Sequence, residues 1–312
     1  MIEFNLKKYI DYVKNTIEYP IEDYYIEKDY VISLFLSTWQ NLREQGKLAS
    51  LEKLIFKGGT LLMRNYLFYP RISEDLDFTH QHCEHIRKMS QNKRIQTIRK
   101  LIIPLLKDIK TICDIAGFDF QTNRDNTTYI TSYHHKAVYS LHMYYPSKIT
   151  TVPIRIKIEV NFIEQLQYLT QVQTIGTLVS PTPTLASIGY TLKPIRLQTY
   201  ALEEIVLEKY RALLTRDVPK QRDMYDLYLI NNKGIDIFTI TDKAIIKKIE
   251  SGKLATSRLK KNLSKNCTSI VERGYLDSDD DISLLTLSPV DIPTYERFKK
   301  QLFKRLITIC KK

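Results

Sequence analysis

The chain has 312 residues, of which 43% are hydrophobic, and a formal net charge of +12. Its length exceeds the ~100–200 residues of one domain, so we expect two domains. The N-terminus lacks an apolar leader segment, and the longest apolar run, around residues 31–39, is shorter than the ~20 residues of a membrane span. We therefore expect a cytoplasmic protein, outside membranes, whose positive charge favours polyanionic partners such as nucleic acid.

The cysteine and histidine residues give little sign of a metal centre. The four cysteines, Cys83, Cys113, Cys267 and Cys310, are scattered without a CxxC pair. This spacing argues against a disulfide framework and a structural zinc site, so we expect reduced thiols. The sequence HQHCEH at 80–85 has the ligand types of a transition-metal site. It lacks a distant partner at a familiar spacing and is weak evidence for one.

The first half of the chain changes from helical to strand-like spacing. Residues 23–45 have helical apolar spacing, and residues 86–116 resemble a helix with a basic face that Pro104 interrupts. The apolar period then becomes two, which predicts strands at 127–133, 137–145 and 153–162. We therefore expect a sheet in this half.

The second half of the chain is predominantly helical. A linker rich in Thr, Ser and Pro lies at 177–184, and helical spacing then runs from Thr199 nearly to the end. The helical pattern is broken at 218–220, 231–234 and the acidic loop 277–281. This order predicts an α+β chain, with a mixed-sheet domain over residues 1–195 followed by a helical bundle domain over residues 196–312.

Two acids and two glycines lie close together in GGTLLMRNYLFYPRISEDLDF at 58–78. On a strand, Asp75 and Asp77 point to one face. Their repulsion is tolerated where a divalent cation lies between them, and hard oxygen ligands suit Mg²⁺. Gly58 and Gly59 follow an apolar pair and precede a helical segment. A strand, glycine turn and helix in this order would present backbone N–H groups to a phosphate.

Glu159 is the candidate for a third carboxylate. It is the only acid on the polar face of the 153–162 strand, beside Lys157 and Arg155. Two-metal phosphoryl chemistry usually needs such an acid from another strand. The alternative is an ordinary outward Glu that balances Lys157.

A lysine lies within an apolar stripe in the second half. On the helix at 200–216, Lys209 falls in the middle of this stripe and is expected to face inward. A stem that carries the ammonium to the surface is the alternative. Asp223 and Asp226 are three residues apart and share a helical face, near enough to pair with Lys209 or Arg216. Salt bridging alone would also explain both acids.

Together these motifs resemble the nucleotidyltransferase superfamily of DNA polymerase β and the CCA-adding enzymes. More narrowly, the chain resembles the AbiEii/AbiGii-type toxin nucleotidyltransferases. The resemblance spans roughly residues 27–230, and the tail beyond 231 shows none. The matching segments are EKDYVI, FKGGTLLMRNY, RISEDLDF, KIEVNF and LEEIVLEKYRALLTRDVPKQRDMYDLYLI.

The resemblance implies a polymerase-β-like domain and transfer of a nucleotide from an NTP to an RNA acceptor, with tRNA as the expected acceptor and a cognate antitoxin as partner. A two-metal Mg²⁺ site would be held by Asp75, Asp77 and Glu159, although many superfamily members carry Asp at the third position. These acids would act in catalysis with Lys209 and Asp223, within the EK and RDxYD motifs that include Glu208 and Arg222. The implied nucleotide-binding residues are Lys57, Gly58, Gly59, Thr60, Arg71, Ser73 and Asp226.

Basic residues supply candidates for acceptor binding. From Ile86 through Lys107 there are seven basic residues and no acid. Arg87, Lys88, Lys93 and Arg94 lie in this run and are expected to contact acceptor phosphates. A solvated basic helix is the alternative.

Other functions remain open at this point. The motifs GxxxxGK[ST], HExxH, GxSxG and GxGxxG do not occur, which removes the simplest P-loop, zincin, serine hydrolase and dinucleotide-binding hypotheses. One alternative is a non-catalytic relative that binds nucleic acid or nucleotide. Another is nucleotidylation of a protein or a small molecule. All three carboxylates are present, which favours an enzyme.

Overall fold

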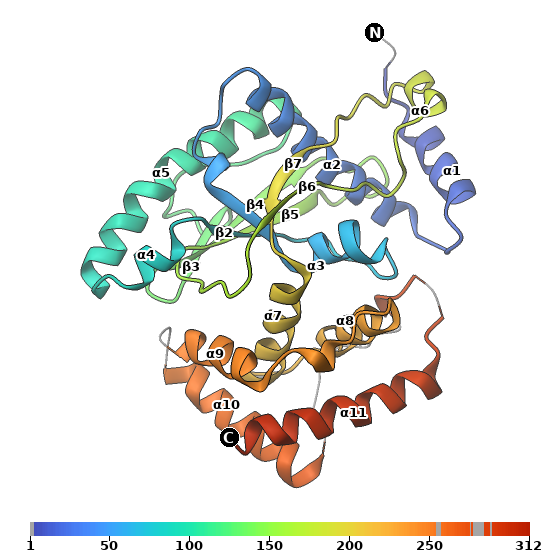
Figure 1. Ribbon diagram of the computed structural model, residues 1–312. Coiled ribbons are helices and arrows are strands. Elements are labelled where there is room, and N and C mark those ends of the chain that lie inside the picture. The colour runs from blue at the N-terminus through green and yellow to red at the C-terminus, as the bar shows by residue number, and fades with distance from the viewer. Residues whose placement is uncertain (1–2, 254–256, 275, 277–283, 288) are drawn as a thin grey trace. The chain divides into compact units, whose positions relative to one another are not determined.

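The computed structural model describes residues 3–253, 257–274, 276, 284–287 and 289–312 (Figure 1). Its contacts divide the chain into two compact units. The first unit is Met1–Ile163 with Thr170–Tyr200, and the second is Glu164–Leu169 with Ala201–Lys312. A functional boundary after residue 195 stays a prediction.

A seven-stranded mixed sheet forms the centre of the first unit. The spatial order is β3-β4-β5-β2-β1-β7-β6. β2 pairs with β5, and β1 with β7, in parallel, whereas the other neighbours are antiparallel. This sheet and the helices around it confirm the predicted α+β class. The strands are β1 (Leu54–Lys57), β2 (Leu76–His80), β3 (Ile130–Tyr133), β4 (Val138–Tyr145), β5 (Ile154–Asn161), β6 (Gln171–Thr174) and β7 (Arg196–Thr199).

Helices cover the apolar face of the sheet. On β5, Ile154, Ile156, Ile158 and Val160 are buried, whereas the alternate residues are exposed or half-buried. Two long helices, α2 (Asp23–Glu44) and α5 (Gln91–Ala116), lie against this side. Trp39 of α2 packs on Phe78 of β2, and Cys113 of α5 meets Met143 of β4. The opposite face of the sheet therefore keeps the polar residues, including Glu159.

The helix α5 runs without a break through Pro104, so the predicted interruption is wrong. Proline removes one helical hydrogen bond. The turns on both sides of Pro104 bury Ile102, Leu105 and Leu106, which holds the helix together. The first unit also contains α1 (Leu6–Thr16), the short 3₁₀-helix Leu51–Lys53, α3 (Gly58–Leu61) with its π-helical extension Leu62–Leu67, α4 (Cys83–Arg87) and α6 (Pro183–Ser187).

The described part of the second unit is helical, as predicted. Its elements are α7 (Leu202–Thr215), α8 (Gln221–Asn232), the 3₁₀-helix Ile237–Thr239, α9 (Asp242–Lys253), α10 (Ser257–Arg273) and α11 (Ile292–Cys310). The predicted breaks at 218–220 and 231–234 fall at the two ends of α8. The predicted acidic loop 277–281 lies outside the described residues. No helix in the described ranges is long and apolar enough to cross a membrane.

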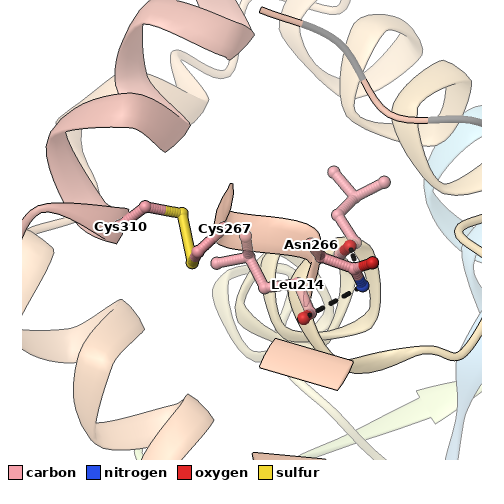
Figure 2. Close-up of a disulfide and its surroundings, with 5 residues drawn as sticks. Leu214, Asn266, Cys267 and Cys310 are labelled. Atoms are coloured by element: carbon pink, nitrogen blue, oxygen red, sulfur yellow. Dashed lines mark hydrogen bonds between the residues drawn. A yellow bond between two sulfur atoms is a disulfide. The ribbon is translucent and has the colours of Figure 1, made fainter. Parts of the chain in front are cut away.

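A disulfide joins α10 to α11 through Cys267 and Cys310 (Figure 2). The expectation of reduced thiols is wrong for this pair, whereas Cys83 and Cys113 are free and buried. The two half-cystines are 43 residues apart, and only the packing of the two helices brings them together. Beside them, the Asn266 amide donates to the carbonyl of Leu214 at 3.2 Å, which ties α10 to the end of α7 (Figure 2).

A buried ion cluster holds the 164–169 segment in the second unit. Lys248 is fully buried and lies 3.0 Å from Glu164 and 2.7 Å from Glu204. The Glu204 carboxylate also accepts from the backbone N–H groups of Gln167 and Tyr168. Every charge of this cluster has a partner, which a buried charge requires. The segment is therefore fixed to α7 and α9.

Candidate active site

The two adjacent glycines lie where β1 ends and α3 begins. Gly58 has φ +80°, which L residues rarely adopt, and a Cβ there would lie 2.4 Å from Asp77 Oδ2. A Cβ at Gly59 would lie 2.7 Å from Ser73 Oγ. Glycine is thus needed at both positions so that the helix start can lie against Asp77 and the loop before β2.

Three carboxylates converge from two neighbouring strands. Asp77 of β2 is directly opposite Glu159 of the parallel strand β5, so both side chains lie on one face. Asp75 comes just before β2. The ammonium of Lys157 lies between the acids, 3.2 Å from Asp75 Oδ2 and 3.5 Å from Glu159 Oε2. The structure therefore brings together the three acids that the sequence predicted, with a lysine among them.

The negatively charged carboxylates of this cluster repel one another. Burial and the charges of Glu159 and Asp75 together raise the pKa of Asp77 to about 6, although Lys57 and Lys157 act to lower it. Burial alone would lower the pKa of Lys157, but Glu159, Asp75 and Asp77 raise it above its ordinary value. A further positive charge at this face would relieve the repulsion between the acids.

The loop before β2 is fixed by the helix start. Thr60 Oγ1 donates to the Asp75 carbonyl at 2.5 Å and lies 3.1 Å from Ser73 Oγ. Arg71 is buried and donates to the Ile72 carbonyl at 2.7 Å. These contacts position Asp75. The roles of Thr60, Arg71 and Ser73 in phosphate binding stay predictions, as does that of Lys57, whose ammonium lies over a tyrosine ring.

A second charged cluster lies within the helical unit. Lys209 Nζ is 2.8 Å from Asp223 Oδ1 and 2.6 Å from Asp226 Oδ2. Arg216 also pairs with Asp223, at 2.9 Å. Lys209 is only 9% exposed, so it faces inward as predicted and the surface-ammonium alternative is wrong. Salt bridging is real for both acids, and a catalytic role for Lys209 stays a prediction.

The remaining predicted residues lie elsewhere in the first unit. The acceptor-binding candidates occupy the end of α4, its cap and the first turn of α5. In HQHCEH, His80 stacks on Phe162 at 5.2 Å, and burial lowers its pKa to about 4. This is a packing role. Among the described residues, no three His, Cys, Asp or Glu side chains are arranged as metal ligands, and Asp75 and Glu159 have the Lys157 ammonium as their partner instead.

Lys157 is the site residue that sequence reasoning missed. The strand pattern puts Lys157 on the same face as Glu159 and predicts only that the two charges balance each other. Its contact with Asp75 could not be foreseen, because it depends on the pairing of β2 with β5. Ser140 is also new: it faces Glu159 from β4, and its hydroxyl is fully buried.

Comparison with known proteins gives a matching family model and several similar solved structures. The family model described as the nucleotidyl transferase AbiEii toxin of type IV toxin–antitoxin systems matches residues 45–306. The match includes most of the tail beyond 231, where the sequence patterns showed no resemblance. No curated protein matches significantly.

Two of the solved structures illustrate a similarity that extends over nearly the whole chain at low identity. MenT4, a nucleotidyltransferase toxin from Mycobacterium tuberculosis H37Rv, is 13% identical, with 99% of this chain and 90% of that chain covered and a TM-score of 0.47. JHP933 from Helicobacter pylori is 13% identical, with 93% and 95% covered and a TM-score of 0.43. Since the family model matches most of its length, the chain belongs to the AbiEii family of nucleotidyltransferase toxins of type IV toxin–antitoxin systems.

Proposed function

We propose that this nucleotidyltransferase transfers a nucleoside monophosphate from an NTP to a hydroxyl of an RNA acceptor, with tRNA as the expected RNA. The acceptor oxygen forms a new bond to the α-phosphorus, and the bond from that phosphorus to the bridging oxygen of the β-phosphate breaks. Pyrophosphate leaves with that electron pair, and the hydroxyl proton passes to water. Both substrates are present in the cytoplasm, where we place the protein.

The observation that supports this proposal best is the pairing of Asp77 with Glu159 across β2 and β5, beside the glycine helix start. The parallel register puts Asp77 and Glu159 on one face of the sheet, and Asp75 immediately precedes β2. An NTP bound at the start of α3 would have its phosphates near exposed N–H groups. We propose nucleotide contacts for Lys57, Thr60, Arg71 and Ser73 on the same basis.

The acids fit a divalent cation by their donor chemistry. Carboxylate oxygens are ligands that Mg²⁺ prefers. Burial is the main cause of the raised pKa of Asp77, and the repulsion from Glu159 and Asp75 that adds to it would be relieved by a cation. Asp75, Asp77 and Glu159 would hold the ion or ion pair. To do so, Asp75 and Glu159 would exchange Lys157 for metal as their partner. A divalent cation held there would supply charge neutralisation of the transferring phosphate and would lower the pKa of the attacking hydroxyl.

The family motifs add residues from the helical unit. Lys209 and Asp223 are proposed to act in catalysis, and Asp226 in nucleotide binding. The ion pairs within this cluster hold the lysine in one orientation, which a positioned cation requires. As a toxin of a type IV system, the protein is also expected to have a cognate antitoxin.

The direct test incubates the protein with total RNA, Mg²⁺ and each radiolabelled NTP in turn. Label in one RNA size class, lost on addition of EDTA, is the expected result. The matched control is the Asp75→Asn protein, which keeps the fold and lacks one metal-ligand charge. Label in protein instead of RNA would overturn the acceptor assignment, and equal labelling by the control would overturn the role of the carboxylates.

A further inference from the structure

A polar pocket of about 300 Å³ opens at the edge of the sheet, where β3 is the outermost strand. β4 separates this edge from β5 and its Glu159. Three cationic residues and one acid line the pocket, so its net charge is positive. The lining residues are Arg99, Thr122, Asn123, Arg124, Asp125, Ile130, Thr131, Ser132, Lys136 and Tyr139.

The positive charge of this pocket is available to a ligand. Within the described ranges, Arg99, Arg124 and Lys136 form no ion pair. Arg99, Arg124 and Tyr139 line the same pocket, and burial raises the pKa of Tyr139 while the positive charges of Arg124 and Arg99 act to lower it. Tyr139 is 3% exposed and is one of the residues that line the pocket. Two arginines in one pocket can donate charge-assisted hydrogen bonds to a phosphate.

The turn between β3 and β4 contributes Lys136 to the pocket. His134, His135 and Lys136 all have positive φ, from 52° to 64°. Such backbone is costly for residues other than glycine and persists only where the surroundings fix it. Here the Ala137 N–H donates to the carbonyls of Tyr133 and His134. Tyr133 directly follows the lining residue Ser132 and is 48% exposed, so it offers a ring surface at the end of β3.

We propose that this pocket is a subsite for a single-stranded stretch of the acceptor RNA, with one or two phosphates held by Arg99, Arg124 and Lys136 and a neighbouring base stacked on Tyr133. The assignment rests on the proposed RNA acceptor. A cationic groove beside an exposed aromatic ring is how proteins bind single strands. Arg99 also continues the acid-free basic run of α5, which extends the positive surface away from the pocket.

The test measures the affinity of the full chain for a fluorescent single-stranded RNA of about 12 nucleotides over a series of salt concentrations. Arg99→Gln with Lys136→Gln removes two exposed cations of the pocket. Lys7→Gln with Lys8→Gln removes the same charge from exposed positions of α1. Since each phosphate contact contributes ~0.7 to the salt slope for a single strand, the pocket variant should lose about 1.4 from the slope and the control much less.

Tyr133→Leu is the second variant, and it separates stacking from charge. It should weaken binding about tenfold without changing the salt slope, because stacking releases no counterions. Equal slopes for the pocket variant and the α1 control would overturn the proposal. A raised KM for NTP with an unchanged RNA slope would also overturn it, since the pocket would then belong to the nucleotide.

The binding assay does not depend on nucleotide transfer. A negative result for the RNA subsite can therefore be distinguished from a negative result for the proposed function. If the wild-type protein labels no RNA but the pocket variant still loses its salt slope, the acceptor reaction is wrong and the RNA subsite stands. If transfer to RNA occurs and neither variant changes binding, the reaction stands and the subsite is wrong.

Discussion

At the scale of single residues, the charge on Asp77 conflicts with stability and is expected to serve transfer. Its pKa of about 6 lies above the ordinary 3.8, so the folded protein holds this proton more tightly than the unfolded chain. The associated stability is present below pH ~4 and is lost as pH rises through ~6. Asp77→Asn should therefore raise stability above pH 7 by on the order of 1–2 kcal/mol, after allowance for solvent screening.

The same Asp77→Asn protein should lose transfer by about 10²-fold or more, because a charge that stabilises the transition state is gone. Urea unfolding in EDTA at pH 4 and pH 8, with single-turnover rates in Mg²⁺, measures both effects. Wild-type rates would remove Asp77 from the reaction. A loss of stability at pH 8 would show that the charge is needed for folding.

Lys157 is expected to compete with metal for the acids. Its ammonium lies near Asp75 and Glu159, so Lys157→Met should tighten Mn²⁺ binding about tenfold and lower stability in EDTA by ~1 kcal/mol. Arg155→Met is the matched control, because it lies two residues earlier on the same face of β5 and is exposed. Electron paramagnetic resonance of free Mn²⁺ gives the affinity. Weaker Mn²⁺ binding in Lys157→Met would contradict the competition.

At the scale of elements, the start of α3 depends on the absence of a side chain. Gly58→Ala adds a Cβ 2.4 Å from Asp77 Oδ2 at φ +80°, which should cost ~2–4 kcal/mol in stability and most of the transfer activity. Gly46→Ala is the matched control, since Gly46 has φ +71° and nothing within 4 Å of a Cβ. Gly46→Ala should lower the free energy of unfolding by only ~1 kcal/mol, which is the cost of a positive φ at alanine, and it should leave transfer unchanged. Equal thermal shifts in the two variants would mean that the contact with Asp77 is unimportant.

The end of β2 should make the first unit sensitive to acid. Burial depresses the pKa of His80 to about 4 from 6.5, so the unfolded chain binds the proton first. Stability is therefore full above pH ~6.5 and falls toward pH ~4, by up to about 3 kcal/mol. His80→Asn keeps an acceptor for the His82 N–H and has no titrating ring. Denaturant unfolding at pH 7 and pH 4 should show a smaller acid loss in the variant; an identical loss would assign the acid sensitivity to other groups.

At the scale of the whole molecule, the question is whether the helical unit only supports the fold or also contributes to transfer. Lys209→Met leaves Asp223 and Asp226 buried with less compensation, which should cost ~3–5 kcal/mol. Lys209→Met with Asp226→Asn removes one of the uncompensated charges and should recover part of that stability. Melting curves and single-turnover rates on the same samples give the comparison.

The two outcomes of the Lys209 experiment have different meanings. If stability returns in the double variant while transfer stays at least about 10²-fold low, the cluster acts in the reaction. If transfer returns in step with stability, Lys209, Asp223 and Asp226 are a structural ion cluster. Arg216→Gln is a useful companion, because it removes the partly exposed partner of Asp223 and leaves Lys209 in place.

Local pattern predicted much of the fold. The alternation at 153–162 became β5, and the helical spacing at 23–45 became α2, because side-chain period is a property of neighbouring residues. Pro104 is an exception, since packing against the sheet outweighed the local preference of proline. The disulfide is a second exception, because Cys267 and Cys310 come together only when their two helices pack.

The sequence by itself determined the α+β class, the family resemblance and the acids to examine, because these follow from residue types and short spacings. Only the tertiary structure decided that Asp77 lies opposite Glu159 and that Lys157 lies between the acids, because strand register sets both. The tertiary structure alone also brings Arg99, Arg124 and Lys136 to one pocket. These residues come from a helix, a loop and a turn, and no local period relates segments that meet only when the chain folds.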